Sequence, residues 1–157
     1  MNYDKVVKIL IVMLVFLVGF MSAYFVNYYS TGFTYFNGSV RAPSDFVDNK
    51  NILVYPDKVI IELEGARVSS YAPTGSMVPV LDVGANGISV KPHSEEEIQV
   101  GDIISFWREG DLIVHRVVEK ETDEQGIYFV TKGDNSFVSD GKVRFGDVEH
   151  RLIGLIY

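Results

Sequence analysis

Four side chains in this chain are of the types that together can cleave an amide bond by nucleophilic attack. Ser76 lies in the stretch APTGSMVPV, where the glycine and the proline predict a turn. His115 lies inside the apolar stretch LIVHRVV, and Asp134 and Asp140 follow in the polar stretch KGDNSFVSD. An imidazole can take the proton of a serine hydroxyl when a carboxylate holds its other ring nitrogen. These residue types therefore permit a triad of Ser76, His115 and one of the two aspartates.

Each of these residues also has a simpler structural explanation. A serine on a turn often bonds a backbone group, and a histidine inside a strand can lie on the strand's polar face. The sequence GDN is common in turns, so Asp134 can serve only to form one. The other histidines are poorer candidates, because His93 precedes an acidic run and His150 lies between two charged residues. Composition alone therefore leaves the triad open.

The elements that would position these residues are predicted to be short strands. From residue 52 onward, stretches rich in β-branched and aromatic residues alternate with clusters of Gly, Asn and Asp, a pattern typical of antiparallel sheets. Residues 94–97 predict a solvated loop or a single helical turn, and no long amphipathic helix is apparent. The predicted strands are 59–63, 88–90, 103–107, 112–118, 128–131 and 152–157. We expect a mainly β fold, with a β-rich catalytic domain over residues 59–157.

The N-terminal region predicts a membrane anchor within residues 1–30. Residues 9–26 contain no charged side chain, and roughly 20 apolar residues cross a bilayer core of about 30 Å as a helix. A buried core helix would carry polar residues on one face, and a cleaved signal peptide would show a small-x-small cleavage site. The stretch has neither feature. Lys5 and Lys8 precede it, so the positive-inside rule predicts a short cytoplasmic N-terminus and an extracytoplasmic remainder.

Residues 31–58 are predicted to form a loop or linker of unassigned role. The sequence Asn37-Gly38-Ser39 is a glycosylation sequon, which would be used only on the outer side of a membrane. The formal net charge of −7 argues against a nucleic-acid partner. The chain contains no cysteine, which excludes disulfides and thiolate catalysis. We expect neither a metal ion nor a cofactor.

Four stretches, in this order, resemble those of type I signal peptidases, and in particular the archaeal and endoplasmic-reticulum branch. The stretches are Thr74–Pro79 (the serine block), Val100–Phe106 (a core strand), Ile113–Val118 (the base block) and Lys132–Asn135 continued to Asp140 (the acid block). The bacterial enzymes of this family carry a lysine where this chain has His115. The chain therefore resembles the branch that uses serine, histidine and aspartate.

The resemblance implies a role for each residue of these blocks. It makes Ser76 the nucleophile, His115 the general base and Asp140 the acid that orients it. Asp134 is the close alternative; otherwise it would hold its loop or pair with Arg116. The implied oxyanion donors are the Ser76 amide and the Thr74 hydroxyl. The implied structural residues near the site are Gly75, Met77, Pro79, Arg116 and Gly133.

The implied protein is a membrane-anchored serine endopeptidase that removes signal peptides from secreted preproteins. It would cut after small residues on the outer face of an archaeal cell membrane or the endoplasmic-reticulum membrane. Its partners would be preproteins, the lipid bilayer, and partner subunits or the translocation machinery. One alternative is an inactive, membrane-anchored β domain that binds preproteins or partner subunits, although the intact residue set counts against it. A self-cleaving repressor-type peptidase is disfavoured, because such proteins use Ser-Lys chemistry and have no anchor.

Overall fold

The structure is a computed structural model that describes residues 3–36 and 41–157. It divides into two compact units, Met1–Ser39 and Val40–Tyr157, and each is described here by itself. The predicted sequon at Asn37 lies outside the described residues.

The first unit contains the helix α1 (Tyr3–Phe36). Its segment Tyr3–Ala23 has a mean hydropathy of 2.6 and, by length and composition, is able to cross a membrane. The helix continues beyond the predicted boundary at residue 30, so residues 31–36 are helical where we expected a linker. A single glycine, Gly32, costs a helix only about 1 kcal/mol and does not end it here.

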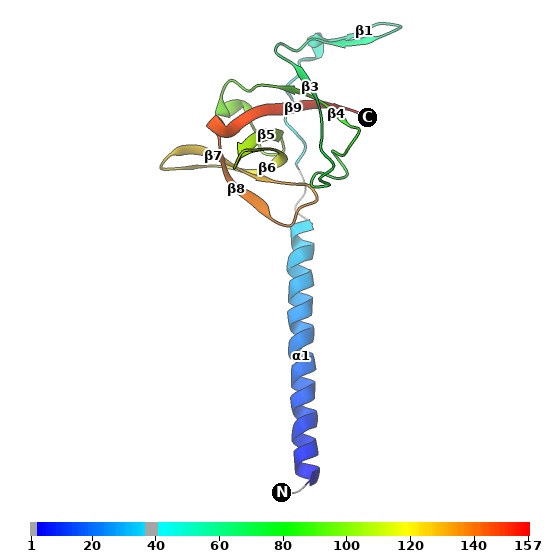
Figure 1. Cartoon of the computed structure of the whole chain (residues 1–157), viewed down its shortest axis with the longest axis vertical. Coiled ribbons are helices and arrows are strands. Elements are labelled where there is room, and N and C mark those ends of the chain that lie inside the picture. Colours follow the sequence, from blue (N-terminus) through cyan, green and yellow to red (C-terminus); the bar gives the residue numbers. More distant parts are fainter. Residues whose placement is uncertain (1–2, 37–40) are drawn as a thin grey trace. The chain divides into compact units, whose positions relative to one another are not determined.

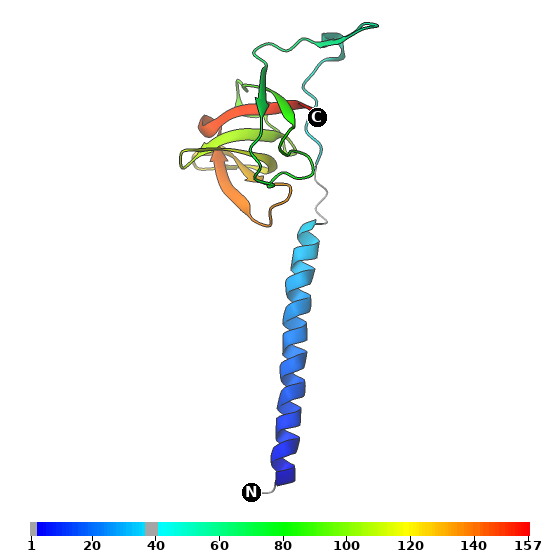
Figure 2. The ribbon, with the colours of Figure 1, turned by 45° about the vertical axis from the view of Figure 1, so that its right-hand side comes forward.

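The second unit is built on a seven-stranded antiparallel sheet, which confirms the predicted mainly β fold (Figure 1). The strand order is β3-β4-β9-β5-β6-β7-β8, so the last strand of the chain lies between β4 and β5 (Figure 2). The strands are β3 (Arg67–Ser70), β4 (Asn86–Val90), β5 (Ile103–Arg108), β6 (Asp111–Asp123), β7 (Gly126–Lys132), β8 (Ser139–Arg144) and β9 (Val148–Ile156).

Three strands were not predicted. The strand β8 has the sequence SDGKVR, which is poor in strand-forming residues, and it forms where Val143 pairs with the buried Phe129 of β7. The strand β3 (RVSS) pairs with β4. The strand β1 (Ile52–Val54) lies in the predicted linker and pairs with β2 (Val59–Ile61), which falls in the predicted strand 59–63, as a separate two-stranded sheet. Single turns of 3-10 helix, η1 (Asn49–Asn51), η2 (Glu95–Glu97) and η3 (Phe145–Asp147), complete the unit, and η2 fits the turn predicted at 94–97.

Two apolar clusters hold the sheet and the serine segment in place. Strand side chains, together with Ile98 directly after η2, form the larger cluster, which consists of Ile98, Ile104, Phe106, Val117, Phe129, Val143 and Val148. The smaller cluster contains Met77, Leu81 and Ile103, each no more than 4% exposed. It joins the segment after Ser76 to the start of β5. The hydrophobic effect thus fixes the position of this segment against the sheet.

Residues 41–46 are packed against the sheet unit and are not a free linker. The fully buried carboxylate of Asp102 accepts hydrogen bonds from the Ser44 amide (2.7 Å) and hydroxyl (3.0 Å). It also pairs with Arg151, whose Nε lies 3.1 Å from Asp102 Oδ2. Gly101 has a φ of +106°, and a side chain there would collide with the Ala42 carbonyl. This segment therefore closes over the buried Asp102–Arg151 ion pair.

Candidate active site

The serine segment is a turn that presents Ser76 to a cavity. Gly75 adopts a φ of +69°, in the left-handed region that favours glycine. After it, the Leu81 amide donates to the Met77 carbonyl at 2.9 Å, and the Val78–Pro79 peptide bond is cis. Because Met77 is buried beneath the turn, the adjacent Ser76 side chain is left at the cavity wall.

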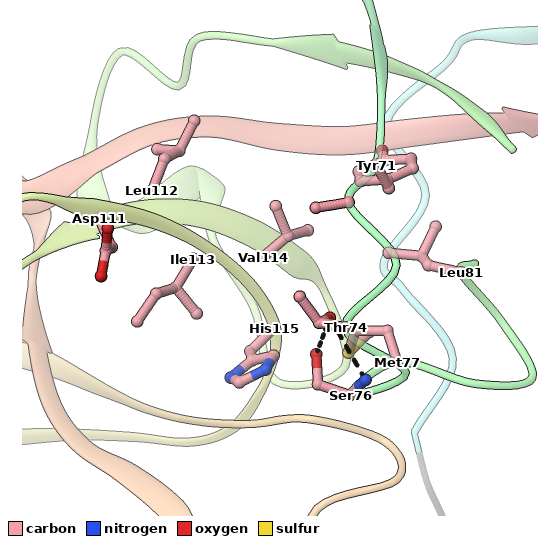
Figure 3. Close-up of a pocket in the computed structure, with 11 residues that line it drawn as sticks. Tyr71, Thr74, Ser76, Met77, Leu81, Asp111, Leu112, Ile113, Val114 and His115 are labelled. Atoms are coloured by element: carbon pink, nitrogen blue, oxygen red, sulfur yellow. Dashed lines mark hydrogen bonds between the residues drawn. The ribbon is translucent and has the colours of Figure 1, made fainter. Parts of the chain in front are cut away.

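The cavity has a volume of about 490 Å³ and lies between the serine segment and the first residues of β6 (Figure 3). Apolar side chains, among them Tyr71, Leu81 and Val114, make up much of its lining. Ser76 and His115 are both lining residues, and Figure 3 shows the imidazole beside the serine side chain. The predicted nucleophile and the predicted base therefore share one cavity.

Asp140 contacts His115 directly. Its Oδ2 lies 2.7 Å from His115 Nδ1 and accepts a second hydrogen bond from the Thr131 hydroxyl at 2.8 Å. The three residues come from the adjacent strands β6, β7 and β8, so the register of the sheet brings them together. The His115 and Asp140 side chains are only 12% and 15% exposed.

The electrostatic surroundings favour the charged form of Asp140. Burial by itself would raise the pKa of this carboxyl, but the hydrogen bonds from His115 and Thr131, together with the charges of His115 and Arg108, hold the pKa below its ordinary value. An ionised carboxylate accepts a hydrogen bond from the Nδ1–H group, so the ring proton stays on Nδ1. This leaves Nε2 of the imidazole free to accept another proton.

Asp134 contacts Arg116 and has no bond to His115. Its two carboxylate oxygens accept hydrogen bonds from Arg116 Nε (2.8 Å) and Nη2 (2.7 Å), and both side chains are less than a tenth exposed. The remaining guanidinium nitrogen donates to the Gly101 carbonyl at 2.8 Å. Of the two aspartates left open by the sequence, Asp140 therefore contacts the imidazole, and Asp134 stabilises the loop that follows β7 through its pair with Arg116.

That loop also holds the serine turn. The Asn135 amide donates to the Ser76 carbonyl at 2.8 Å, and its side chain donates to the Gly75 carbonyl at 3.1 Å. A Cβ atom on Gly133 would lie 2.6 Å from the Ser76 carbonyl oxygen and 3.0 Å from His115 Nε2. Gly133 therefore marks the point where the serine backbone and the imidazole come closest to the loop.

The Ser76 hydroxyl is bonded to Thr74 rather than to His115. Its Oγ lies 3.2 Å from Thr74 Oγ1, and Thr74 Oγ1 also accepts a hydrogen bond from the Ser76 backbone amide at 3.4 Å (Figure 3). Hydrogen bonds between catalytic groups are often long or absent until a substrate binds. The arrangement nevertheless places the Ser76 amide and the Thr74 hydroxyl, the two predicted oxyanion donors, on the same side of the serine.

Some residues near the site could not be predicted. Thr131 and Asn135 lie in or beside the acid block. The bond of Thr131 to Asp140 depends on the pairing of β7 with β8, and the bond of Asn135 to Gly75 joins residues 60 apart in the sequence. Pro79 is exposed and is not among the residues that line the cavity. Within residues 3–36 and 41–157, no cluster of three or more His, Asp or Glu side chains is arranged to hold a metal ion.

Comparison with known proteins gives one partial similarity. No protein-family model and no solved structure matches the chain. Signal peptidase I W of Bacillus subtilis (strain 168) is 32% identical to it over 68 residues, which amount to 43% of this chain and 36% of that protein. Because the matched stretch spans only about a third of the relative, the similarity is coarse. It supports a likeness to a type I signal peptidase in part of the chain.

Proposed function

We propose that this protein is a membrane-anchored serine endopeptidase that removes signal peptides from preproteins, with Ser76, His115 and Asp140 as its triad. The observation that carries the proposal is the 2.7 Å contact between His115 Nδ1 and Asp140 Oδ2, at a cavity that Ser76 and His115 both line. The partial similarity to a signal peptidase supports the same class of reaction.

The proposed reaction is acyl transfer through a serine ester. Ser76 Oγ attacks the scissile carbonyl carbon while His115 Nε2 takes its proton, and Asp140 stabilises the imidazolium that forms. The imidazolium then gives the proton to the leaving amine. A water molecule, deprotonated by the same nitrogen, hydrolyses the ester and restores Ser76.

The oxyanion that develops during attack needs donors on the far side of the carbonyl. The Ser76 amide and the Thr74 hydroxyl are the proposed donors, and each such bond contributes roughly 3 kcal/mol of transition-state stabilisation. The Ser76 amide donates to Thr74 Oγ1 at 3.4 Å, a long hydrogen bond that an oxyanion can replace. Met77 and Gly75 hold the turn that carries both groups.

An open strand edge supports binding of an extended substrate. Residues 111–115 of β6 pair with β5 on one side, whereas β7 begins its pairing with β6 only at Arg116. Among the described strands, none pairs with the other side of residues 111–115, and this stretch lines the cavity. A peptide strand can add to such an edge through backbone hydrogen bonds. The apolar walls suit the small residues expected next to the cut.

The apolar helix supports the proposed location. We propose that α1 is an uncleaved, single-pass anchor whose N-terminus, with Lys5 and Lys8, lies in the cytoplasm. The β unit would then act on the outer face of an archaeal cell membrane or the endoplasmic-reticulum membrane, on preproteins delivered by translocation machinery or partner subunits. Enzyme and substrate would both be held at the bilayer.

The bond between the Ser76 and Thr74 hydroxyls favours a second candidate, a non-catalytic β domain that only binds preproteins. Incubating the detergent-solubilised full chain with a synthetic preprotein separates the two. We expect cleavage at one site by the wild type and by the control Ser69→Ala, which changes an exposed serine on β3, and none by Ser76→Ala. Binding of the preprotein without cleavage by any variant would establish the non-catalytic candidate instead.

A further inference from the structure

Asp111 places a carboxylate in the cavity at the other end of the open edge from His115. It is the first residue of β6, it is exposed, and it lines the same cavity as Ser76 and His115. Side chains two residues apart share a face of a strand, so Asp111, Ile113 and His115 point the same way, as Figure 3 shows. The face therefore presents an acidic, an apolar and an imidazole group in succession.

No cation within the described residues is paired with this carboxylate. Arg108, the residue opposite Asp111 in the β5–β6 register, donates instead to the Lys142 carbonyl at 2.9 Å and lies over the Phe106 ring. The Asp111 carboxylate is therefore exposed to the cavity without a basic side chain from the described residues beside it. A charged group on a largely apolar wall favours a ligand that brings the opposite charge to that point.

An extended substrate on the open edge would bring a defined residue to Asp111. Strand residues rise about 3.3 Å each, so four residues cover roughly 13 Å. A substrate residue beside His115 is followed two positions along by one beside Ile113, and four positions along by one beside Asp111. All three substrate side chains would lie on the same face as the enzyme side chains that they meet.

We propose that Asp111 is a specificity-determining residue that binds a lysine or arginine side chain, four residues from the substrate residue beside His115. The proposal rests on the proposed peptidase function and names a substrate class for it: peptides with a basic residue at one fixed position relative to the cut. Because Asp111 is exposed, we expect the basic residue to raise kcat/KM about two- to fivefold at low salt, as for solvent-exposed ion pairs. High salt should remove the preference.

The test is a lysine scan of a cleavable peptide. One lysine is moved through the five positions on either side of the cut, with glutamine at the same positions as the neutral reference, and kcat/KM is measured. For the wild type we expect a single favourable position, lost in Asp111→Asn and replaced by a preference for glutamate in Asp111→Lys. Glu109→Gln is the matched control, because it removes an exposed charge from the same turn but from a residue that does not line the cavity.

Two results separate this inference from the proposed function. If the peptides are cleaved but the lysine scan of the wild type matches that of Asp111→Asn, the acidic subsite is wrong and the peptidase stands. If nothing is cleaved, the acidic subsite is tested by peptide binding instead. Fluorescence anisotropy then compares the affinity of labelled peptides for Ser76→Ala and for the double variant Ser76→Ala, Asp111→Asn. Tighter binding of the lysine peptide than of the glutamine peptide, lost when Asp111 is replaced, would support the subsite. Equal binding of the two peptides would overturn it.

Discussion

Replacing Asp140 with asparagine removes the charge beside His115 while keeping the size of the side chain. The Asp140 carboxylate accepts two short hydrogen bonds on one oxygen, from His115 Nδ1 (2.7 Å) and from the Thr131 hydroxyl (2.8 Å). An amide that turns its NH₂ group toward Nδ1 can only donate, which forces the imidazole proton onto Nε2. In that tautomer His115 cannot accept the proton of Ser76.

We expect a large loss of turnover from Asp140→Asn, although the two side chains have nearly the same shape. In a serine protease triad this substitution lowers turnover about 10⁴-fold with the geometry preserved. At about 1.36 kcal/mol for each factor of ten, that corresponds to roughly 5 kcal/mol of lost transition-state stabilisation. Part of the loss is the wrong tautomer, and part is the missing negative charge beside the imidazolium.

The assay is cleavage of one preprotein peptide under kcat conditions, with thermal unfolding followed by circular dichroism. Asp147→Asn is the matched control, because it makes the same chemical change at an exposed residue of η3. We expect wild-type turnover from the control. Turnover by Asp140→Asn within tenfold of wild type, at a temperature where both proteins are folded, would refute the role of Asp140 in orienting His115.

Three further predictions concern the surroundings of the triad. Gly133→Ala should lower activity at least tenfold, because its Cβ would press on His115 and the serine turn, while Gly146→Ala, which meets open space, should retain wild-type turnover. Asp134→Asn should destabilise the fold by roughly 3–5 kcal/mol in chemical denaturation, because Arg116 is left as a buried charge without its partner; a loss below about 1 kcal/mol would contradict this. The lowered pKa of Asp140 makes its ionised carboxylate stabilise the fold at pH values above the ordinary pKa of 3.8, and this contribution is lost as the pH falls through the folded-state pKa. The Tm difference between wild type and Asp140→Asn should therefore shrink when the pH falls below the folded-state pKa. A Tm difference that stays constant with pH would contradict the lowered pKa of Asp140.

The sequence predicted those strands whose own residues favour a strand. The segments that became β5, β6 and β7 are rich in Ile, Val and Phe, and each was expected near its observed position. The strand β8 was missed, because its Ser, Asp, Gly and Lys residues are extended only through pairing with β7. The helix α1 was expected from its apolar run, but its end at Phe36 was not.

In the site, too, the contacts that depend on strand pairing could not be predicted. The types of Ser76 and His115 and the turn at Gly75 could be recognised in the sequence, but the choice between two aspartates depended on strand register. Only the pairing of β6, β7 and β8 brings Asp140 to His115 and leaves Asp134 to Arg116. Contacts of the segment 41–46 with Asp102 and Arg151 join residues too distant in the chain for any local pattern to reveal.

The proposed role of Ser76 as nucleophile is tested most directly by locating the covalent intermediate. The full chain is mixed with a peptide ester substrate, quenched in acid and digested, and the acylated residue is identified by mass spectrometry. We predict one acyl group, on Ser76, in the wild type, and much less in His115→Gln, whose side chain cannot serve as the base. Acylation of another residue, or peptide cleavage by Ser76→Ala at the wild-type rate, would contradict the proposed mechanism.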